Sequence, residues 1–189
     1  MRRNIIVLII VVSAISFIAY QNSRYVLNDD NQAVITQFGR VIGKARVVPG
    51  EYYKIPFVHK VHYFKKAFHL SENSQEIPTK DKKFISFKKR AFWKISDPIQ
   101  FYKKLNSYKL AKEFVLDHTG AAERDIVTSH TLAEIVGNVS DNENLNDVDC
   151  DRLIEQKIIN MSKQSMPAAG ISLRNIEAKV TYPLNTRKP

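Results

Sequence analysis

The chain has 189 residues, of which 44% are hydrophobic and 25% are charged, a length and balance that suit one or two compact domains and exclude a disordered protein. Lys and Arg number 29 against 19 Asp and Glu, so the formal net charge is +10. This excess favours an anionic partner but does not choose among the candidates.

The first element that we expect is a membrane helix. An uncharged, mostly apolar run extends from Ile5 to Tyr20 and would reach roughly 24 Å as a helix, against about 30 Å for a hydrocarbon core. Snorkelling of the flanking polar side chains and local thinning of the bilayer can absorb this mismatch. A cleaved signal peptide is the alternative, but the run ends without a small-x-small cleavage pattern. We therefore expect an uncleaved transmembrane helix over residues 5–20.

The charges beside this run predict its orientation. Arg2 and Arg3 precede it, whereas a mixed set of acidic and basic residues follows it. By the positive-inside rule, residues 1–4 are then cytoplasmic and everything beyond Gln21 lies outside the cytoplasm.

Strand patterns begin after a linker that we expect at residues 21–31. β-Branched and aromatic residues from Ala33 to Phe38, and from Val41 to Val48 beyond Gly39, predict a first hairpin. The strands expected next lie at residues 51–55 and 58–70.

The clearest strand runs from Phe84 to Ile95, where side chains alternate between two faces. The face expected toward the core carries Ile85, Phe87, Ala91, Trp93 and Ile95. The face expected toward solvent carries Ser86, Lys88, Arg90 and Lys94. Lys89 and Phe92 break the alternation. One packed and one solvated face are typical of an antiparallel sheet.

Helical periodicity follows this strand. Asp97 as an N-cap and Pro98 after it predict a short helix through Tyr102. Apolar residues at intervals of three and four predict a longer helix from Leu110 to Val127, which Gly120 could interrupt. Three further elements are a short helix capped by Ser129, an amphipathic helix from Leu153 to Ser165, and a last strand from Ile171 to Tyr182.

Strands followed by helices, with one closing strand, predict an α+β domain in which helices pack on a mostly antiparallel sheet. We expect this domain over residues 32–183, with a short tail at residues 184–189. The polar segment from Asn138 to Asp147 is expected to be a loop within it.

Five segments stand out in order along the chain. They are AVITQFGRV (33–41), PGEYYKIPFVHKV (49–61), WKISDPIQFY (93–102), RDIVTSHTLAEIV (124–136) and AAGISLRNIEAKVTYP (168–183). Their content and order resemble the HflC branch of the SPFH family, also called band 7 or stomatin/prohibitin-like. Five collinear segments are far more specific than any one of them.

The resemblance implies a scaffold of the bacterial inner membrane that is not an enzyme and needs no cofactor. Its single-pass helix would carry an SPFH domain on the periplasmic side. Its implied partners are the lipid bilayer, an HflK-like sister protein and an FtsH-like membrane protease. Together these would form a large hetero-oligomer that restrains access of membrane substrates to the protease.

Two departures from the family keep a second interpretation open. Family members continue from the last strand into a long Ala/Glu-rich helix, whereas this sequence stops at Pro189. The segment from Phe84 to Lys94 is also unusually basic for the branch. In the second interpretation the chain is a truncated, membrane-tethered SPFH adaptor or lipid-binding domain without protease regulation.

The sequence assigns no catalytic, cofactor-binding or metal-binding residue. His59 and His62 are three apart on an expected strand, so their side chains point to opposite faces and cannot easily share a metal. No Gly-x-Ser-x-Gly elbow accompanies the Ser, His and Asp residues. Gly39 and Gly43 are isolated turn residues rather than a phosphate-binding loop.

The acidic segment from Asp141 to Asp147 and the lone Cys150 are weak candidates. Counted as an EF-hand loop in either of two registers, the segment places a leucine where an oxygen ligand is required, so calcium is disfavoured. Cys150 permits no intramolecular disulfide and no cysteine zinc cluster. Its neighbours Asp149 and Asp151 would disfavour a reactive thiolate.

A basic and aromatic run is the remaining candidate. It comprises Lys80, Lys82, Lys83, Phe84, Phe87, Lys88, Lys89, Arg90, Phe92, Trp93 and Lys94. A nucleic-acid site would need rings and cations on one surface, but the strand alternation separates most rings from Lys88, Arg90 and Lys94. We therefore expect no nucleic-acid partner, and contact with anionic lipid headgroups and a simple solvated face stay equally open.

Overall fold

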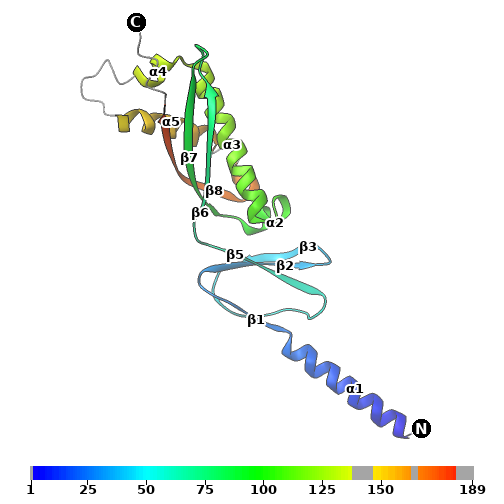
Figure 1. Cartoon of the computed structure of the whole chain (residues 1–189). Coiled ribbons are helices and arrows are strands. Elements are labelled where there is room, and N and C mark those ends of the chain that lie inside the picture. Colours follow the sequence, from blue (N-terminus) through cyan, green and yellow to red (C-terminus); the bar gives the residue numbers. More distant parts are fainter. Residues whose placement is uncertain (1, 138–146, 163–165, 182–189) are drawn as a thin grey trace. The chain divides into compact units, whose positions relative to one another are not determined.

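The computed structural model of the chain describes residues 2–137, 147–162 and 166–181 (Figure 1). The chain divides into two compact units, residues 1–66 (unit 1) and 67–189 (unit 2), and each is described by itself. Both units contain antiparallel strands, and helices pack on the sheet of unit 2. The fold is therefore of the mixed α+β class that the sequence predicts.

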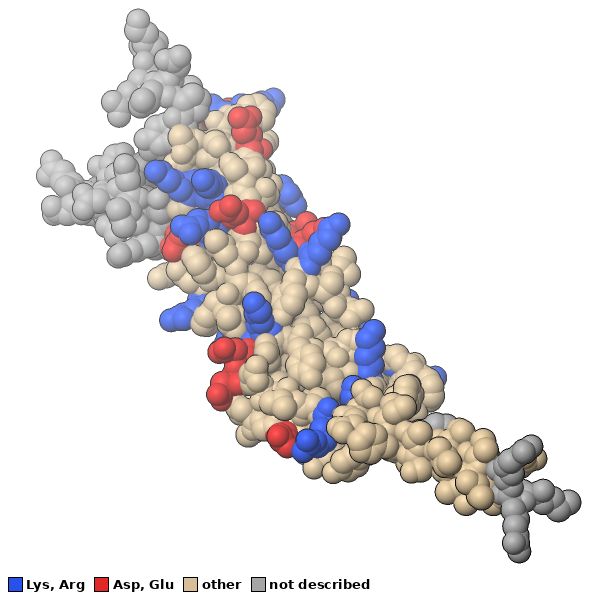
Figure 2. All heavy atoms as spheres, turned by 60° about the horizontal axis from the view of Figure 1, so that its bottom comes forward, with Lys and Arg blue, Asp and Glu red and all other residues tan. Residues whose placement is uncertain are grey.

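Unit 1 begins with a long apolar helix. This helix, α1 (Arg2–Gln21), has 20 residues, and its described large apolar side chains range in exposure from 48% at Val11 to 65% at Tyr20. In Figure 2 the described part of α1 displays no acidic or basic side chain. In the part of the chain that the structure describes, no helix has both the length and the apolarity needed to cross a membrane.

Two antiparallel sheets form the rest of unit 1. One pairs β1 (Arg24–Leu27) with β4 (Gly50–Tyr53), and the other has the strand order β3-β2-β5. The strands of the second sheet are β2 (Asn31–Gln37), β3 (Arg40–Arg46) and β5 (His59–Lys65). β2 is central, and its residues 32–36 are all buried. The predicted hairpin forms as β2 and β3, whereas the sequence did not predict β1.

Unit 2 is built on an antiparallel sheet with the strand order β6-β7-β8. Its strands are β6 (His69–Pro78), β7 (Phe84–Ile95) and β8 (Ile171–Thr181). The bounds predicted for β7 are confirmed, and all five side chains predicted to face the core are buried. The single strand predicted over residues 58–70 is wrong, because this stretch is divided between β5 and β6, in different sheets.

Unit 2 also contains helices, and the two longest of them pack on this sheet (Figure 1). Its helices are α2 (Pro98–Lys104), α3 (Tyr108–Ser129), α4 (Leu132–Gly137), α5 (Asp147–Ser162) and a 3₁₀ turn, η1 (Pro167–Ala169). α3 packs against β6 and α5 packs against β8, and the two helices also contact each other. The carboxylate of Glu155 on α5 accepts a hydrogen bond of 2.7 Å from the backbone N–H of Ala178. This bond satisfies a donor on the edge of β8 that another strand could otherwise use.

Local capping signals account for the helix starts. Asp97 accepts hydrogen bonds from two backbone N–H groups of α2, as predicted. α3 continues through Gly120 without interruption. The predicted cap of α4 is wrong by two residues, because Ser129 is the last residue of α3. Thr131 caps α4 instead: its N–H donates to the Glu134 carboxylate at 2.7 Å, and the Glu134 N–H donates to the Thr131 hydroxyl at 3.2 Å, which is a capping box.

Candidate functional site

His59 and His62, which the sequence singled out and rejected as metal ligands, each contact a protein group. Nδ1 of His59 accepts a hydrogen bond of 3.2 Å from the backbone N–H of Ile55, and Nε2 of His62 lies 3.0 Å from the hydroxyl of Thr36. Burial of the His62 ring, with a smaller contribution from Lys60, lowers its pKa. In the described ranges, no three or more His, Cys, Asp and Glu side chains gather in a way that could hold a metal ion.

Two candidates from the sequence fall outside the described residues. The loop expected from Asn138 to Asp147, with its disfavoured calcium site, lies there except for Asp147, which begins α5. Cys150 is a residue of α5, but the structure does not describe its side chain.

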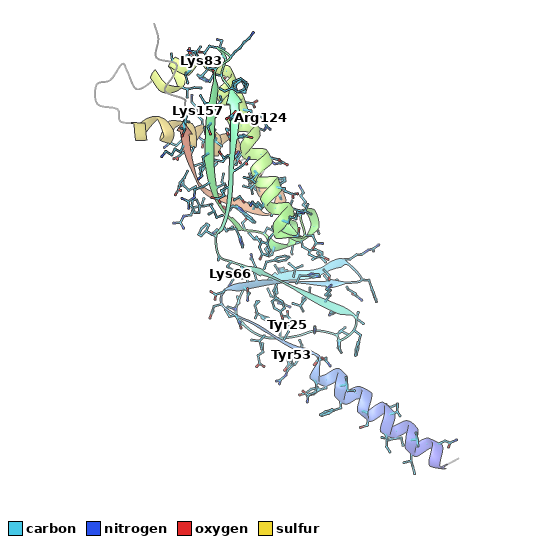
Figure 3. All side chains as sticks on the ribbon, viewed as in Figure 1. Tyr25, Tyr53, Lys66, Lys83, Arg124 and Lys157 are labelled. Atoms are coloured by element: carbon cyan, nitrogen blue, oxygen red, sulfur yellow. The ribbon has the colours of Figure 1, made fainter. Side chains whose placement is uncertain are left out.

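The basic run of unit 2 does not form a single patch. Lys88, Arg90 and Lys94 lie on the exposed face of β7, as predicted. Lys83, which Figure 3 labels, forms an ion pair of 3.3 Å with Asp81 in the preceding turn. Figure 2 shows Lys and Arg side chains spread over the surface in view, with Asp and Glu between them. Lys89 differs from its neighbours, because its side chain is buried against the helices.

Lys89 forms a buried ion pair with Glu123 on α3. The Nζ atom of Lys89 lies 2.7 Å from Oε2 of Glu123, and the two side chains are 1% and 0% exposed. Gln75 on β6 donates a hydrogen bond of 3.0 Å to the other carboxylate oxygen. Loss of hydration lowers the pKa of Lys89, an effect that its hydrogen bond to Glu123 opposes. The pair joins β6, β7 and α3 through charge-assisted hydrogen bonds.

Gly120 provides the space that this pair occupies. A Cβ atom at position 120 would lie 3.2 Å from Nζ of Lys89. A residue with poor helix propensity is thus found in the middle of α3 where a side chain would crowd the ammonium group. The two irregularities in the sequence, Lys89 on a core face and Gly120 in a helix, have the same cause.

The exposed face of the unit 2 sheet combines aromatic rings with cations. The ring centroid of Phe68 lies 5.5 Å from Nζ of Lys94 and 4.7 Å from the guanidinium carbon of Arg174. The guanidinium of Arg90 lies 5.7 Å from the ring centroid of Phe92. The rings hold these cations by cation–π attraction, so this face presents positive charge above apolar surface.

Unit 1 contains an aromatic cluster that joins its two sheets. The ring of Tyr25 stacks on Tyr52 at 5.7 Å and meets Tyr63 edge-on at 6.3 Å. The guanidinium of Arg46 lies 5.2 Å from the Tyr52 ring. Burial raises the pKa of the Tyr25 hydroxyl, and the nearby charge of Arg46 opposes that shift. Figure 3 shows Tyr25 inside unit 1, whereas Tyr53 is 68% exposed.

Two phenylalanines stand at loop tips of unit 1. Phe38 follows β2 and is 84% exposed, and Phe57 precedes β5 and is 86% exposed. Among the described residues no large apolar side chain is more exposed than these two. Both have left-handed backbones, with φ of 47° and 65°. A bulky residue in this region is an outlier that costs about 1–3 kcal/mol, and such strain concentrates at functional positions.

A contact between Ser129 and His130 lacks the geometry of a nucleophile and its base. The Ser129 hydroxyl lies 3.0 Å from Nδ1 of His130, but the same nitrogen lies 2.8 Å from the carbonyl of Ile126. A carbonyl can only accept, so Nδ1 must donate there and cannot take the serine proton. This pair is therefore not a candidate for nucleophilic catalysis.

Comparisons with known proteins agree with the resemblance found in the sequence. The SPFH domain / Band 7 family matches residues 25–181. A protein from Treponema pallidum (strain Nichols) named Protein HflC is 36% identical over 113 residues, which are 59% of this chain and 34% of that protein. Protein HflC from Buchnera aphidicola subsp. Schizaphis graminum (strain Sg) is 28% identical over 101 residues, 49% of this chain and 33% of that protein. The chain thus spans about a third of the length of these curated relatives.

Proposed function

Because this chain belongs to the SPFH domain / Band 7 family, we propose that it is a membrane-anchored scaffold related to HflC, which joins an HflK-like sister protein and restrains an FtsH-like membrane protease. The observation that carries the proposal is the family match over residues 25–181, which begins just beyond the apolar helix α1. In this role the chain binds partners and catalyses no reaction.

Although no described helix meets the length and apolarity of a membrane span, we propose that α1 is the anchor and crosses a bacterial inner membrane once, with residues 1–4 in the cytoplasm and the main domain in the periplasm. At about 1.5 Å per residue a helix of 20 residues is about 30 Å long, the thickness of a hydrocarbon core. The apolar part, residues 5–20, is shorter, and local thinning with snorkelling polar ends would bring it across. Its exposed apolar side chains support this assignment, because lipid would remove them from water.

The test is extraction of the tagged full chain from membranes in a mild detergent, together with candidate HflK-like and FtsH-like partners. Size-exclusion chromatography followed by mass spectrometry then identifies what elutes with the chain. Elution with either partner in a very large particle supports the proposal. An unrelated tagged single-pass protein, expressed at the same level, controls for trapping in shared micelles.

A small particle that contains neither partner would end the regulatory proposal. The second candidate, a membrane-tethered SPFH adaptor or lipid-binding domain, would then remain. The cations that Phe68 holds on the exposed face of unit 2 favour it, because they could contact anionic headgroups without a protein partner.

A further inference from the structure

We infer that one end of the exposed face of the unit 2 sheet binds an acidic, partly apolar segment of a partner protein. This surface, called the Phe68 surface, consists of Phe68, Leu70, Phe92, Lys94 and Arg174. Such binding goes beyond the proposed function, because it concerns unit 2 alone and needs neither the anchor nor the protease. It adds a binding surface, its residues and the chemistry of the partner.

The register of the sheet brings rings and a cation together. Leu70 of β6 is directly opposite Phe92 of β7, and Lys94 lies two residues farther along β7 on the same face. Phe68 precedes the first residue of β6, and its ring centroid is 5.5 Å from Nζ of Lys94. Side chains two residues apart on one strand share a face at a spacing of about 7 Å. The apolar row and the cation row are therefore neighbours.

A β-bulge brings Arg174 to the same surface. The register of β8 on β7 shifts between Phe92 and Trp93, and Arg174 is the extra residue. Arg174 and its neighbour Asn175 are both exposed as a result, as expected where a bulge redirects a side chain. The guanidinium carbon of Arg174 lies 4.7 Å from the Phe68 ring centroid, although β7 separates β8 from β6. The extra residue thus places a second cation beside this ring.

Neither cation of the Phe68 surface has an acidic partner among the described residues. The ion pairs of the described chain all join other side chains. Residues 67–70, 92–96 and 171–175, which form this end of the sheet, include no acidic residue. Two positive charges beside one ring repel each other, so a carboxylate that contacts both would remove a repulsion and form charge-assisted hydrogen bonds. The surface therefore favours an anionic group.

Apolar area lies directly beside these cations. Phe68 and Leu70 are 42% and 44% exposed, and Phe92 is half-buried. Covering such area with an apolar group is favourable, and a carboxylate alone would leave it in water. The ligand that fits both rows carries a carboxylate and an apolar side chain about 7 Å apart, which in an extended chain are two residues apart. A protein segment has this chemistry.

Acidic residues farther along the same face favour a narrow segment over a bilayer. Glu72 and Glu177 stand on either side of Arg90 in the next row of the sheet, and Glu76 lies beyond them. All three glutamates are exposed. A planar layer of anionic headgroups laid on this face would also meet these carboxylates, and like charges repel. A segment of one chain can contact the Phe68 surface without reaching them.

The same face carries a second pair of cations, without rings, which provides a matched control. Lys88 and Lys179 are directly opposite each other on β7 and β8, and both are exposed. Ser74 is the neighbour of Lys88 on β6. K88A/K179A therefore removes the same charge from this face as K94A/R174A does, but leaves the Phe68 surface unchanged.

The test uses the full-length chain in nanodiscs of zwitterionic phosphatidylcholine. The probe is a dye-labelled peptide of Glu-Glu-Leu-Leu repeats, in which an extended chain presents glutamate and leucine alternately on each face. Fluorescence anisotropy measures its affinity, and empty nanodiscs give the background. In one control peptide glutamine replaces every glutamate, and in the other serine replaces every leucine.

We expect K94A/R174A to weaken binding of the probe about tenfold or more, and K88A/K179A to weaken it less than about twofold. F68A should weaken it about threefold or more, because the ring both covers apolar area and holds the cations. Equal losses in K94A/R174A and K88A/K179A would overturn the inference, because binding would then follow net charge. Equal affinity for the serine peptide would also overturn it, because the rings would take no part.

Lysine acetylation of the wild-type chain distinguishes the possible occupants without any mutation. Mass spectrometry compares the acetylation rates of Lys94 and Lys88, and we expect the probe to slow acetylation of Lys94 alone. Slower acetylation of Lys94 in nanodiscs that contain phosphatidylglycerol, with no effect of the probe, would overturn the inference in favour of lipid. Slower acetylation that depends only on the number of chains per nanodisc would overturn it in favour of a second copy.

Discussion

The backbone of Gly170 lies directly against that of Phe101, so that a Cβ atom on Gly170 would stand 2.7 Å from the Phe101 nitrogen and would overlap the carbonyl oxygen of Asp97. Gly170 has a φ of 72°, and its carbonyl accepts the backbone N–H groups of Ser96 and Asp97 at 2.9 and 3.2 Å. This contact fixes the start of β8 on the start of α2.

We expect G170A to lower the free energy of unfolding of unit 2 by more than about 2 kcal/mol, because it adds a steric overlap to the cost of a left-handed backbone, itself about 1–2 kcal/mol. Emission of Trp93, the single tryptophan, follows unfolding of this unit in detergent micelles. G170N is the matched control. Asparagine tolerates the left-handed backbone, so rescue by G170N would show that conformation rather than overlap sets the cost.

The buried pair of Lys89 and Glu123 predicts strongly non-additive mutations. E123A leaves the Lys89 ammonium buried without its carboxylate. We expect this variant to lower the free energy of unfolding of unit 2 by about 3–5 kcal/mol. The double variant K89M/E123L replaces both charges by apolar groups of similar size and should recover most of that loss. Urea unfolding, followed by the emission of Trp93, measures the free energy of unfolding of both variants.

The exposed pair of Arg90 and Glu177 provides the comparison for the buried pair. Its atoms lie 3.2 Å apart, but its side chains are 47% and 50% exposed. We expect E177A to change the unfolding free energy by less than about 1 kcal/mol. If E123A cost no more than E177A, burial would not govern the strength of the Lys89 pair.

Asp81 predicts a pH dependence of stability. Its carboxylate accepts hydrogen bonds from the Thr79 hydroxyl at 2.6 Å and from the Leu132 N–H at 2.9 Å, and these lower its pKa from 3.8 to about 2. Because the folded-state pKa is the lower one, the stabilisation is present above about pH 4 and disappears as the pH falls toward 2.

The measurement is the Tm of unit 2 as a function of pH for the wild type and for D81N, in the same micelles. We expect the wild type to be more stable at pH 5 and the gap to close toward pH 2. D125N, at an exposed position on α3, should run parallel to the wild type. A gap between wild type and D81N that stays constant with pH would contradict this account of Asp81.

Ser71 is the hydrogen-bond partner of the buried Trp93 indole. The indole N–H donates to the Ser71 hydroxyl at 2.9 Å, and the two side chains are 0% and 2% exposed. S71A would leave the indole N–H of Trp93 without an acceptor. We therefore expect the free energy of unfolding to fall by about 1–3 kcal/mol and the emission of Trp93 to shift to the blue. S74A, at an exposed position on the same strand, should change stability by less than about 0.5 kcal/mol.

Elements with a strong local pattern were predictable from the sequence. The alternation from Phe84 to Ile95 predicted β7 with its core face, and Asp97 before Pro98 predicted the start of α2. Both patterns depend only on residues that are neighbours in the sequence, so they can be recognised without knowledge of the fold. The same limited range explains why β1 was missed: its four residues form a strand only because β4 lies beside them.

The sequence by itself determined the apolar helix, the main strands and helices, and the membership of the SPFH family, because each follows from local periodicity or from the order of short segments. Only the tertiary structure decided which charges and rings are covered. Lys89 is buried because Glu123, 34 residues away, meets it across a helix that Gly120 leaves open. Phe38 and Phe57 stay exposed because each stands in a turn with a left-handed backbone, which holds its ring outside the apolar core. Burial is a property of long-range packing, and no local pattern contains it.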